Sequence, residues 1–361
     1  MPFSQVQHYI IIDYWFCPTK IKDLISDSTL QRNLKSRMAK KKKLFCFGYG
    51  YTAHHLAEAL RALSVSGEEE WVVGGTTRTK EKRAAMRAHG LEAYVFDDDK
   101  PLGDPFSMMA GTTHLLISTP PGQEGDIVFE HHAEDIIHMM PELEWVGYLS
   151  TTGVYGDRDG AWVDEMSPSR PSTIRGTRRA RAENQWISLV HGHKLPVHIF
   201  RLAGIYGPGR CALDSIRSGI ARRIMKPGHA FCRVHVDDIV AVLVNSMHAP
   251  KAGEIYNVAD DEPAPSHEVI AYASRLLGQE PPPLVRFEDA NLAPITISFY
   301  SENKSVRNTK IKIDLGVKLL YPNYRVGLES CLLKEKAYEE SGDAHPWIAG
   351  VGPEFAGQLT S

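Results

Sequence analysis

The chain has 361 residues, of which 43% are hydrophobic and 24% are charged, and its formal net charge is −3. This length is enough to bury the core of one large domain or of two joined lobes. The nearly balanced charge argues against nucleic acid or an anionic membrane as a general partner. The five cysteines are far apart and form no C-x-x-C pair, which favours free thiols in a reducing cytoplasm.

The first apolar run, "YIIIDYWF" (9–16), is interrupted by Asp13 and is far too short to span a bilayer. It also lacks the basic front and the small-residue cleavage site of a signal peptide. Residues 1–43 end in the basic run "KSRMAKKKK" and resemble nothing downstream. We interpret them as an N-terminal extension with Met38 as the natural start of the protein. The extension is either disordered or a short helix packed on the domain.

From residue 44 onward, apolar runs alternate with segments of helical periodicity. Strands are expected at 44–48, 71–77, 92–96, 113–119, 145–151 and 196–202, and helices at 51–63, 80–90 and 126–140. An arginine-rich stretch, "STIRGTRRARAEN" (172–184), opens a further helix. Apolar strands that alternate with helices indicate an α/β protein with a doubly wound parallel sheet of the Rossmann type.

Beyond residue 204 the sequence becomes looser and richer in proline, which suits a smaller C-terminal substrate lobe. The expected organisation is an extension (1–43), a dinucleotide-binding Rossmann lobe (44–204), a mixed region that completes this lobe and forms the substrate lobe (205–335), and a C-terminal tail (336–361).

A glycine-rich loop follows the first strand directly, in "FGYGYTAHHL" (47–56). Gly48, Gly50 and Ala53 match the G-x-G-x-x-G/A fingerprint at the position where it binds a dinucleotide. Gly48 permits a tight turn, Gly50 lets the backbone approach a pyrophosphate, and Ala53 lets the helix pack closely on the strand. The loop therefore predicts a dinucleotide cofactor.

The end of the second strand distinguishes NAD from NADP. It reads "GGTTRTKEK" (74–82) and has no acidic residue at the strand end itself for the ribose hydroxyls, whereas Thr77, Arg78 and Lys80 could hold a 2′-phosphate. NADP is therefore favoured, with NAD as the alternative. Asp97, after the third strand, is expected at the adenine edge. The complete set of expected cofactor residues is Gly48, Tyr49, Gly50, Tyr51, Thr52, Ala53, Thr77, Arg78, Asp97, Thr119 and Pro120.

Four further motifs, "LSTTGVYGD", "RLAGIYGPGR", "RVHVDDIV" and "GEIYNVADDEP", extend this pattern. Together with the glycine loop, the chain resembles the extended short-chain dehydrogenase/reductase family, the NAD-dependent epimerase/dehydratase group, over about residues 44–333. The resemblance implies a Rossmann lobe and a small C-terminal lobe for the substrate, often a nucleotide-sugar. It also implies that Thr151, four residues before the Tyr of "VYG", hydrogen-bonds the reacting oxygen.

The chain departs from the family at the catalytic helix. The family has Tyr-x-x-x-Lys followed four residues later by Glu; aligned on Glu183, these positions hold Arg175 and Arg179. An arginine stays protonated at any working pH and cannot act as the proton-transfer residue. The chain therefore resembles atypical members that keep the fold and the cofactor loop without the dyad.

The arginines allow two interpretations. Arg175 could clamp a carboxylate or phosphate or stabilise an oxyanion, and Arg179 could contact a ribose or phosphate. Alternatively, both lie on a solvated helix face, where Glu183 pairs with Arg179. Tyr155, Tyr206 and His235 are conceivable substitute acids, but each is more typical of a structural position.

Two functions follow from these observations. The first is an NADP-dependent oxidoreductase or epimerase-like enzyme that acts on an unknown carbonyl or sugar-type molecule, with Thr151, Arg175 and Arg179 as catalytic-site residues. The second is an inactive NADP(H)-binding sensor or scaffold. No metal site is expected, because "EHHAEDIIH" (130–138) lacks the HExxH spacing and a distant ligand set. The sequence leaves the oligomeric state open, a homodimer included.

Overall fold

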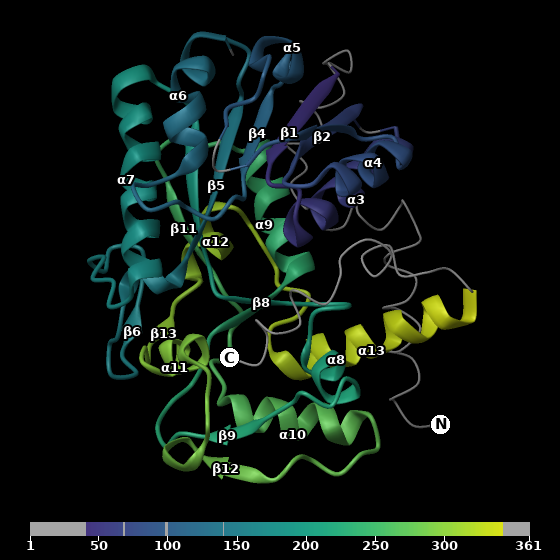
Figure 1. Ribbon diagram of the computed structural model, residues 1–361, viewed down its shortest axis with the longest axis vertical. Coiled ribbons are helices and arrows are strands. Elements are labelled where there is room, and N and C mark those ends of the chain that lie inside the picture. The colour runs from purple at the N-terminus through teal and green to yellow at the C-terminus, as the bar shows by residue number, and fades with distance from the viewer. Residues whose placement is uncertain (1–40, 68, 98–99, 140, 342–361) are drawn as a thin grey trace.

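The structure is a computed structural model, and it describes residues 41–341 except 68, 98–99 and 140 (Figure 1). Its centre is a seven-stranded sheet of order β11-β7-β5-β4-β1-β2-β3, in which every neighbouring pair is parallel. The strands are β1 (Lys42–Phe47), β2 (Trp71–Thr77), β3 (Glu92–Val95), β4 (His114–Ile117), β5 (Trp145–Thr151), β7 (Val197–Leu202) and β11 (Ile255–Val258). This is the doubly wound Rossmann architecture that the alternating pattern predicts.

Helices cover both faces of the sheet (Figure 1). They are α3 (Tyr51–Val65), α4 (Lys80–Ala88), α5 (Pro105–Met109), α6 (Ile127–Met139), α7 (Ile174–His193) and α9 (Val236–His248). Successive side chains of β1 enter different cores: Leu44 and Cys46 pack with α3 and α9, whereas Phe45 and Phe47 pack with α5, α6 and α7. Because both faces are buried, the strand is apolar throughout instead of alternating.

Most of the remaining elements form a smaller lobe beneath the carboxyl edge of the sheet, whereas one of them, α12 (Thr309–Asp314), packs beside β11 of the large lobe (Figure 1). The elements of the smaller lobe are η2 (Thr152–Tyr155), β6 (Trp162–Val163), β8 (Gly204–Tyr206), α8 (Ala212–Arg217), β9 (Arg223–Met225), β10 (Arg233–His235), α10 (Ser266–Leu276), β12 (Leu284–Arg286), η3 (Phe287–Asp289), α11 (Pro294–Tyr300), β13 (Ser305–Val306) and α13 (Tyr324–Ser341). The strands of this lobe pair two by two, as β8 with β10, β9 with β12 and β6 with β13. The lobe is built mainly from the second half of the chain, and it faces the strand ends where the predicted site lies.

Several boundaries differ from the sequence-based expectation. The sheet begins at Lys42, and α13 continues to Ser341, so the segment after residue 336 starts as helix rather than as tail. The seventh strand, β11, comes from the mixed region and completes the Rossmann sheet beside β7. The expectations for residues 1–40, including the start at Met38, lie outside the described residues.

Two further observations concern thiols and membranes. The described cysteines, Cys46, Cys211, Cys232 and Cys331, are all free. Within the described part of the chain, no helix is both long and apolar enough to cross a bilayer.

Candidate functional site

The glycine loop forms a tight turn at the carboxyl end of β1. Gly48 has φ +83°, and its N–H donates to Thr76 Oγ1 at 2.9 Å. A Cβ at Gly48 would lie 3.1 Å from the Thr119 nitrogen, so both the positive φ and the neighbouring β4 loop require glycine here. A Cβ at Gly50 would meet only the Gly48 carbonyl oxygen, at 3.9 Å. The space above Gly50 is therefore open, as backbone contact with a ligand requires.

The start of α3 is suited to an anion. Gly50 is the N-cap residue and provides no side-chain cap, and the first turn has no acidic residue. The first helical hydrogen bond runs from His54 N–H to the Gly50 carbonyl, so the amides of Thr52 and Ala53 precede the helical ladder. Helix N-termini of this kind bind phosphate through backbone amides and the helix dipole. Ala53 is fully buried, which allows the close packing of helix on strand.

A second polar group lies beside the glycine loop and the start of α3 (residues 48–53), which we together call the cradle. Thr119, after β4, is 8% exposed, and its buried Oγ1 has no hydrogen-bond partner among the described residues. An unpaired buried hydroxyl is costly, and a ligand that bonds to it relieves that cost. The cradle and the unpaired hydroxyl fit a dinucleotide. Pro120, next in the chain, is exposed at the rim of the loop.

The side chains of Tyr49 and Tyr51 face the protein and not the open side of the loop. Both are 5% exposed; Tyr49 packs in the core of the large lobe, and Tyr51 donates its hydroxyl to the Pro208 carbonyl at 3.0 Å. These tyrosines can therefore reach a dinucleotide only through their main chains. The sequence pattern alone could not distinguish main-chain from side-chain contact.

The residues expected to select NADP lie at the ends of β2 and β3. Thr77 is buried, whereas Arg78 and Lys80 are exposed. Thr79 caps α4 by accepting a hydrogen bond from Lys82 N–H at 3.2 Å, so Arg78 lies between the strand end and the helix start. Asp97 is half-buried, and its backbone pairs with that of Lys100 in an isolated antiparallel β-bridge. The segment thus presents an unobstructed arginine beside the loop.

Arg179 lies across the carboxyl edge of the sheet. Its Nη1 donates to Leu149 O at 2.8 Å and to the Tyr148 hydroxyl at 3.0 Å, with a longer contact to Thr119 O at 3.4 Å. The structure therefore brings Arg179 together with Thr119 and the end of β5. This placement contradicts the solvated-face interpretation for Arg179.

Arg175, one turn earlier, points elsewhere. It is exposed, and its Cζ lies 5.2 Å from the ring centre of Phe299 on α11. Partial desolvation and the charge of Arg179 lower the pKa of Arg175, and the carboxylate of Glu302 opposes this shift. Arg175 thus reaches from α7 to α11 of the small lobe.

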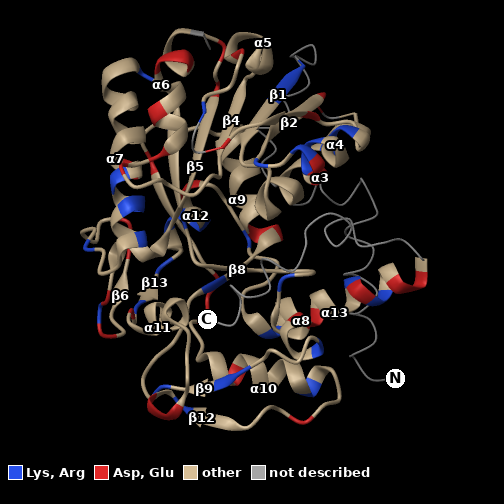
Figure 2. Ribbon diagram, viewed as in Figure 1, with Lys and Arg blue, Asp and Glu red and all other residues tan. Residues whose placement is uncertain are grey.

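The other two arginines of the stretch 172–184 form a separate group. Arg178 and Arg181 line an open cavity of about 460 Å³ with Gln123 and Glu124, and Arg181 pairs with Glu124 at 3.1 Å. In Figure 2, Lys and Arg positions, coloured blue on the ribbon, gather at the end of α7 nearest the small lobe. The basic stretch is therefore divided between the strand edge and the outer surface.

Thr151 ends β5 as expected, and its Oγ1 accepts a hydrogen bond from Gly153 N–H at 3.1 Å. A hydroxyl that accepts one hydrogen bond still has its own proton to donate. Glu183 faces the sheet behind this strand end and pairs with Arg201 at 2.7 Å, with both side chains buried. The expected pairing of Glu183 with Arg179 is therefore wrong, because the side chain of residue 183 points inward.

Several site residues were not found from the sequence. Asp126 is fully buried, and its Oδ1 accepts from the N–H groups of Val128 and Phe129 at 3.0 Å. Burial raises the pKa of Asp126 to about 6, although these amides and the charge of Arg179 oppose the shift. Glu302 enters from the small lobe, where Lys304 and Ser172 contact it. No local sequence pattern identifies Asp126 or Glu302, because the groups that surround each of them come from distant segments of the chain.

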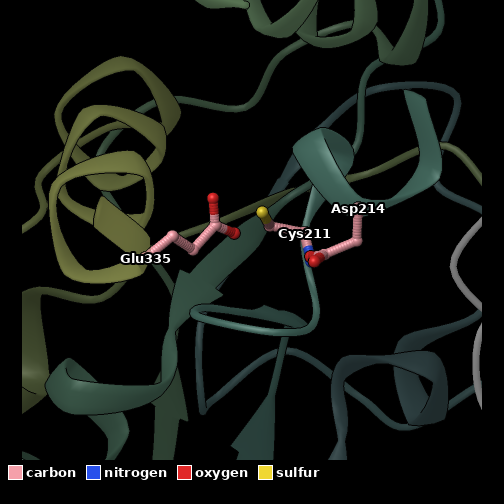
Figure 3. Close-up of side chains that lie close together, drawn as sticks. All are labelled: Cys211, Asp214 and Glu335. Carbon is pink, nitrogen blue, oxygen red and sulfur yellow. The ribbon is translucent and has the colours of Figure 1, made fainter. Parts of the chain in front are cut away.

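Two histidines of the segment "EHHAEDIIH" on α6 contact residues of their own helix. His132 pairs with Asp135 at 2.8 Å, and His138 bonds to the Glu134 carbonyl. A different group, Cys211, Asp214 and Glu335, has ligand atoms within 4.8 Å of one another where α8 meets α13 (Figure 3). Both carboxylates already have protein partners, since Asp214 accepts from Cys211 N–H and Glu335 pairs with Arg217. The group is explained by helix capping and an ion pair.

Known proteins were compared with this chain and this structure. No family model matches the chain. A solved structure of a conserved protein of unknown function from Silicibacter pomeroyi is 49% identical; the match covers 81% of this chain and 99% of that one, with a TM-score of 0.73. Protein YeeZ of Escherichia coli K12 is 28% identical over 299 residues, covering 78% of this chain and 97% of the relative.

Two named enzymes extend the comparison. Human dTDP-D-glucose 4,6-dehydratase is 29% identical over 122 residues, which cover 31% of this chain and 34% of the enzyme. UDP-glucuronic acid 4-epimerase from Bacillus cereus, solved in complex with NAD, is 17% identical and has a TM-score of 0.66 over 84% of this chain and 99% of its own. At this identity, the similarity shows that the epimerase and this chain share a fold.

The fold and these matches together define the class: the chain has the fold of the extended short-chain dehydrogenase/reductases, the group of the NAD-dependent epimerases and dehydratases, and it is similar in sequence to one of them over 31% of its length. By sequence it belongs to one family with the Silicibacter pomeroyi protein.

Proposed function

We propose that this protein binds a nicotinamide dinucleotide, NADP(H) in preference to NAD(H), and oxidises or reduces a small carbonyl or sugar-type molecule with an acidic group. The carrying observation is the open cradle at Gly50, where an uncapped α3 and the unpaired Thr119 hydroxyl face the same loop. The NAD complex of the Bacillus cereus epimerase supports this reading of the loop. Bound there, such a cofactor supplies reversible two-electron oxidation of an alcohol.

The preference for NADP rests on charge at the end of β2. Arg78 is exposed beside the loop, and no acidic residue of the β2–α4 connection opposes it. An arginine bonds a phosphate through two parallel N–H groups, which makes it selective for the 2′-phosphate.

Three residues of the chain bind and position the substrate, each in a different way. Thr151 donates a hydrogen bond from its hydroxyl to the reacting oxygen, since its Oγ1 already accepts one from Gly153 N–H and keeps its own proton free to donate. Arg175 binds the acidic group of the substrate against Phe299. Arg179 fixes the relative positions of the β4 and β5 ends and thereby shapes the floor of the site.

Titration of the protein with NADPH and with NADH, followed by nicotinamide fluorescence, tests the cofactor half of the proposal. Arg78→Ala should weaken NADPH binding by about tenfold or more and leave NADH unchanged, since a charged hydrogen bond contributes roughly 1.5–3 kcal/mol. Arg83→Ala, in the helix α4 that follows Arg78, is the matched control. Equal affinities of the wild type for the two cofactors would refute the NADP preference.

The catalytic half is tested by the absorbance of reduced nicotinamide with phenylglyoxylate, pyruvate and 9,10-phenanthrenequinone. Turnover of the two keto acids and its loss in Arg175→Ala, with NADPH affinity intact, is expected. Binding of NADPH without turnover of any probe would instead favour a sensor or scaffold.

A further inference from the structure

The side chain of Glu302 extends from the small lobe and places its carboxylate near Gly153, just after the carboxyl end of β5. It lies between α11 and β13, and its side chain is 11% exposed. Lys304 Nζ contacts Oε2 at 2.7 Å, and the Ser172 hydroxyl donates to Oε1 at 2.8 Å. The carboxylate is therefore held in one position by a cation and a hydroxyl, close to the start of α7.

The glycine at position 153 makes room for this carboxylate. A Cβ at Gly153 would lie 3.9 Å from Glu302 Oε2 and 3.5 Å from Thr151 Oγ1. The carboxylate and the threonine hydroxyl thus lie within 4 Å of a single point beside the end of β5. A substrate oxygen bonded to Thr151 is within reach of Glu302 after a small movement, because catalytic hydrogen bonds often tighten only when the ligand is bound.

The other candidate acids are engaged elsewhere. The Tyr155 hydroxyl donates to Asn257 at 2.7 Å and accepts from Arg201 at 2.9 Å. Tyr206 contacts the Asn323 carbonyl at 3.4 Å, and His235 is fully buried as the cap of α9. None of these three groups presents a transferable proton to the space above Thr151.

We propose that Glu302 is the proton-transfer residue of the site, in place of the acid that α7 lacks. This inference rests on the proposed function. In the direction of reduction, the O–H bond of the Glu302 carboxylic acid breaks, and the proton forms a new O–H bond on the substrate oxygen. The two electrons come from the reduced nicotinamide cofactor. The resulting carboxylate is stabilised by Lys304 and takes its next proton from water; oxidation runs in reverse.

Glu302→Gln is the direct test, because the amide has the same shape but cannot transfer a proton; its one oxygen can accept from Lys304, and its NH₂ group can donate to the Ser172 hydroxyl. With NADPH and phenylglyoxylate, kcat should fall by about 100-fold or more, the usual contribution of general acid–base catalysis. NADPH affinity should be unchanged, whereas the urea midpoint should decrease because Lys304 loses its carboxylate partner. Asp157→Asn is the matched control. Asp157 accepts a hydrogen bond from the N–H of Asn303, the residue after Glu302, at 2.8 Å, so this variant removes an exposed carboxylate near Glu302.

A binding measurement adds a readout independent of turnover. Phenylglyoxylate should bind the complex of Glu302→Gln with NADP⁺ at least as tightly as the wild-type complex, because the amide NH₂ group donates a hydrogen bond to the keto oxygen. Glu302→Asp keeps the carboxyl group but shortens the side chain, so turnover should be partly lost.

The outcomes separate the inference from the proposed function. Failure of the wild type to bind either dinucleotide would refute both. Wild-type turnover that persists in Glu302→Gln would refute only the role of Glu302. Binding of NADPH with neither turnover nor binding of any probe would also overturn that role. If Glu302→Gln does not fold, turnover in Glu302→Asp decides, and turnover equal to that of the wild type would refute the role of Glu302.

Discussion

Glu183 of α7 and Arg201 of β7 form a two-point ion pair in the interior of the large lobe. Arg201 Nη2 lies 2.7 Å from Glu183 Oε2, and Nε lies 3.1 Å and 3.2 Å from the two carboxylate oxygens. Ser150 donates to the same carboxylate, and Arg201 also donates to the Tyr155 hydroxyl. The pair therefore fixes α7 against the end of β5, the strand that carries Thr151.

Glu183→Gln should destabilise the protein by about 3–5 kcal/mol, because it leaves the buried charge of Arg201 without its partner. The loss should appear as a lower midpoint in urea with little change in slope. Glu124→Gln breaks the exposed pair with Arg181 and is the control, with an expected cost below about 1 kcal/mol. A similar small cost for both variants would show that the interior pair adds little.

This pair also shows where sequence reasoning ends. Helix spacing predicts that Glu183 contacts Arg179 one turn earlier, which holds for residues on an exposed face. Residue 183 instead faces the sheet, where Arg201 is available from a strand that follows in the chain. The interior partner depends on packing, and the local spacing contains no information about it.

The same reasoning explains what could be predicted. The six strands before residue 204 have apolar runs long enough to be visible locally, and their alternation with helices predicts the sheet. The four residues of β11 lie among short elements without clear periodicity, so the seventh strand was not assigned. Gly48 and Gly50 were predictable from a local fingerprint, whereas Glu302 reaches the site from 149 residues after Gly153 and has no such signal.

Substitution of the two loop glycines should separate folding from binding. Gly50→Ala should leave the free energy of unfolding almost unchanged, because the new Cβ meets only one atom, at 3.9 Å, and φ is −100°. The methyl group nevertheless enters the cradle, so dinucleotide affinity should fall by more than tenfold in a fluorescence titration. Gly48→Ala should instead lower stability by about 1–3 kcal/mol, since its φ is +83° and the Cβ crowds Thr119. Full affinity in Gly50→Ala would place the dinucleotide elsewhere.

Asp126 should make stability depend on pH. Its pKa is raised to about 6 from the ordinary 3.8, so the folded protein holds the proton more tightly than the unfolded chain. The associated stability is present below about pH 4 and is lost as pH rises through 6. Asp126→Asn keeps an oxygen for the α6 amides but does not ionise. Relative to the wild type, it should therefore gain about 1–3 kcal/mol between pH 4 and pH 8.

Urea unfolding at a series of pH values measures this difference. A difference between Asp126→Asn and the wild type that does not change with pH would mean that Asp126 is ionised throughout, held by the charge of Arg179.

The double change Arg175→Tyr with Arg179→Lys restores the residue types that the family has on its catalytic helix. The structure predicts a loss of function and not a gain. Arg179 donates to Leu149 O and the Tyr148 hydroxyl together, and a lysine ammonium on a flexible stem does not reproduce that planar arrangement. Tyrosine at 175 also removes the cation that binds an acidic substrate, and a bidentate arginine clamp is worth a few kcal/mol.

Turnover of phenylglyoxylate should consequently fall by about 100-fold, and the urea midpoint should decrease. The control is Arg178→Tyr with Arg181→Lys, which changes the outer arginines beside the open cavity and should leave turnover within about twofold. A rise in turnover would contradict this view of the site. It would mean that the tyrosine supplies the proton over the nicotinamide, so that the site had lacked a proton donor and Glu302 had not served as one.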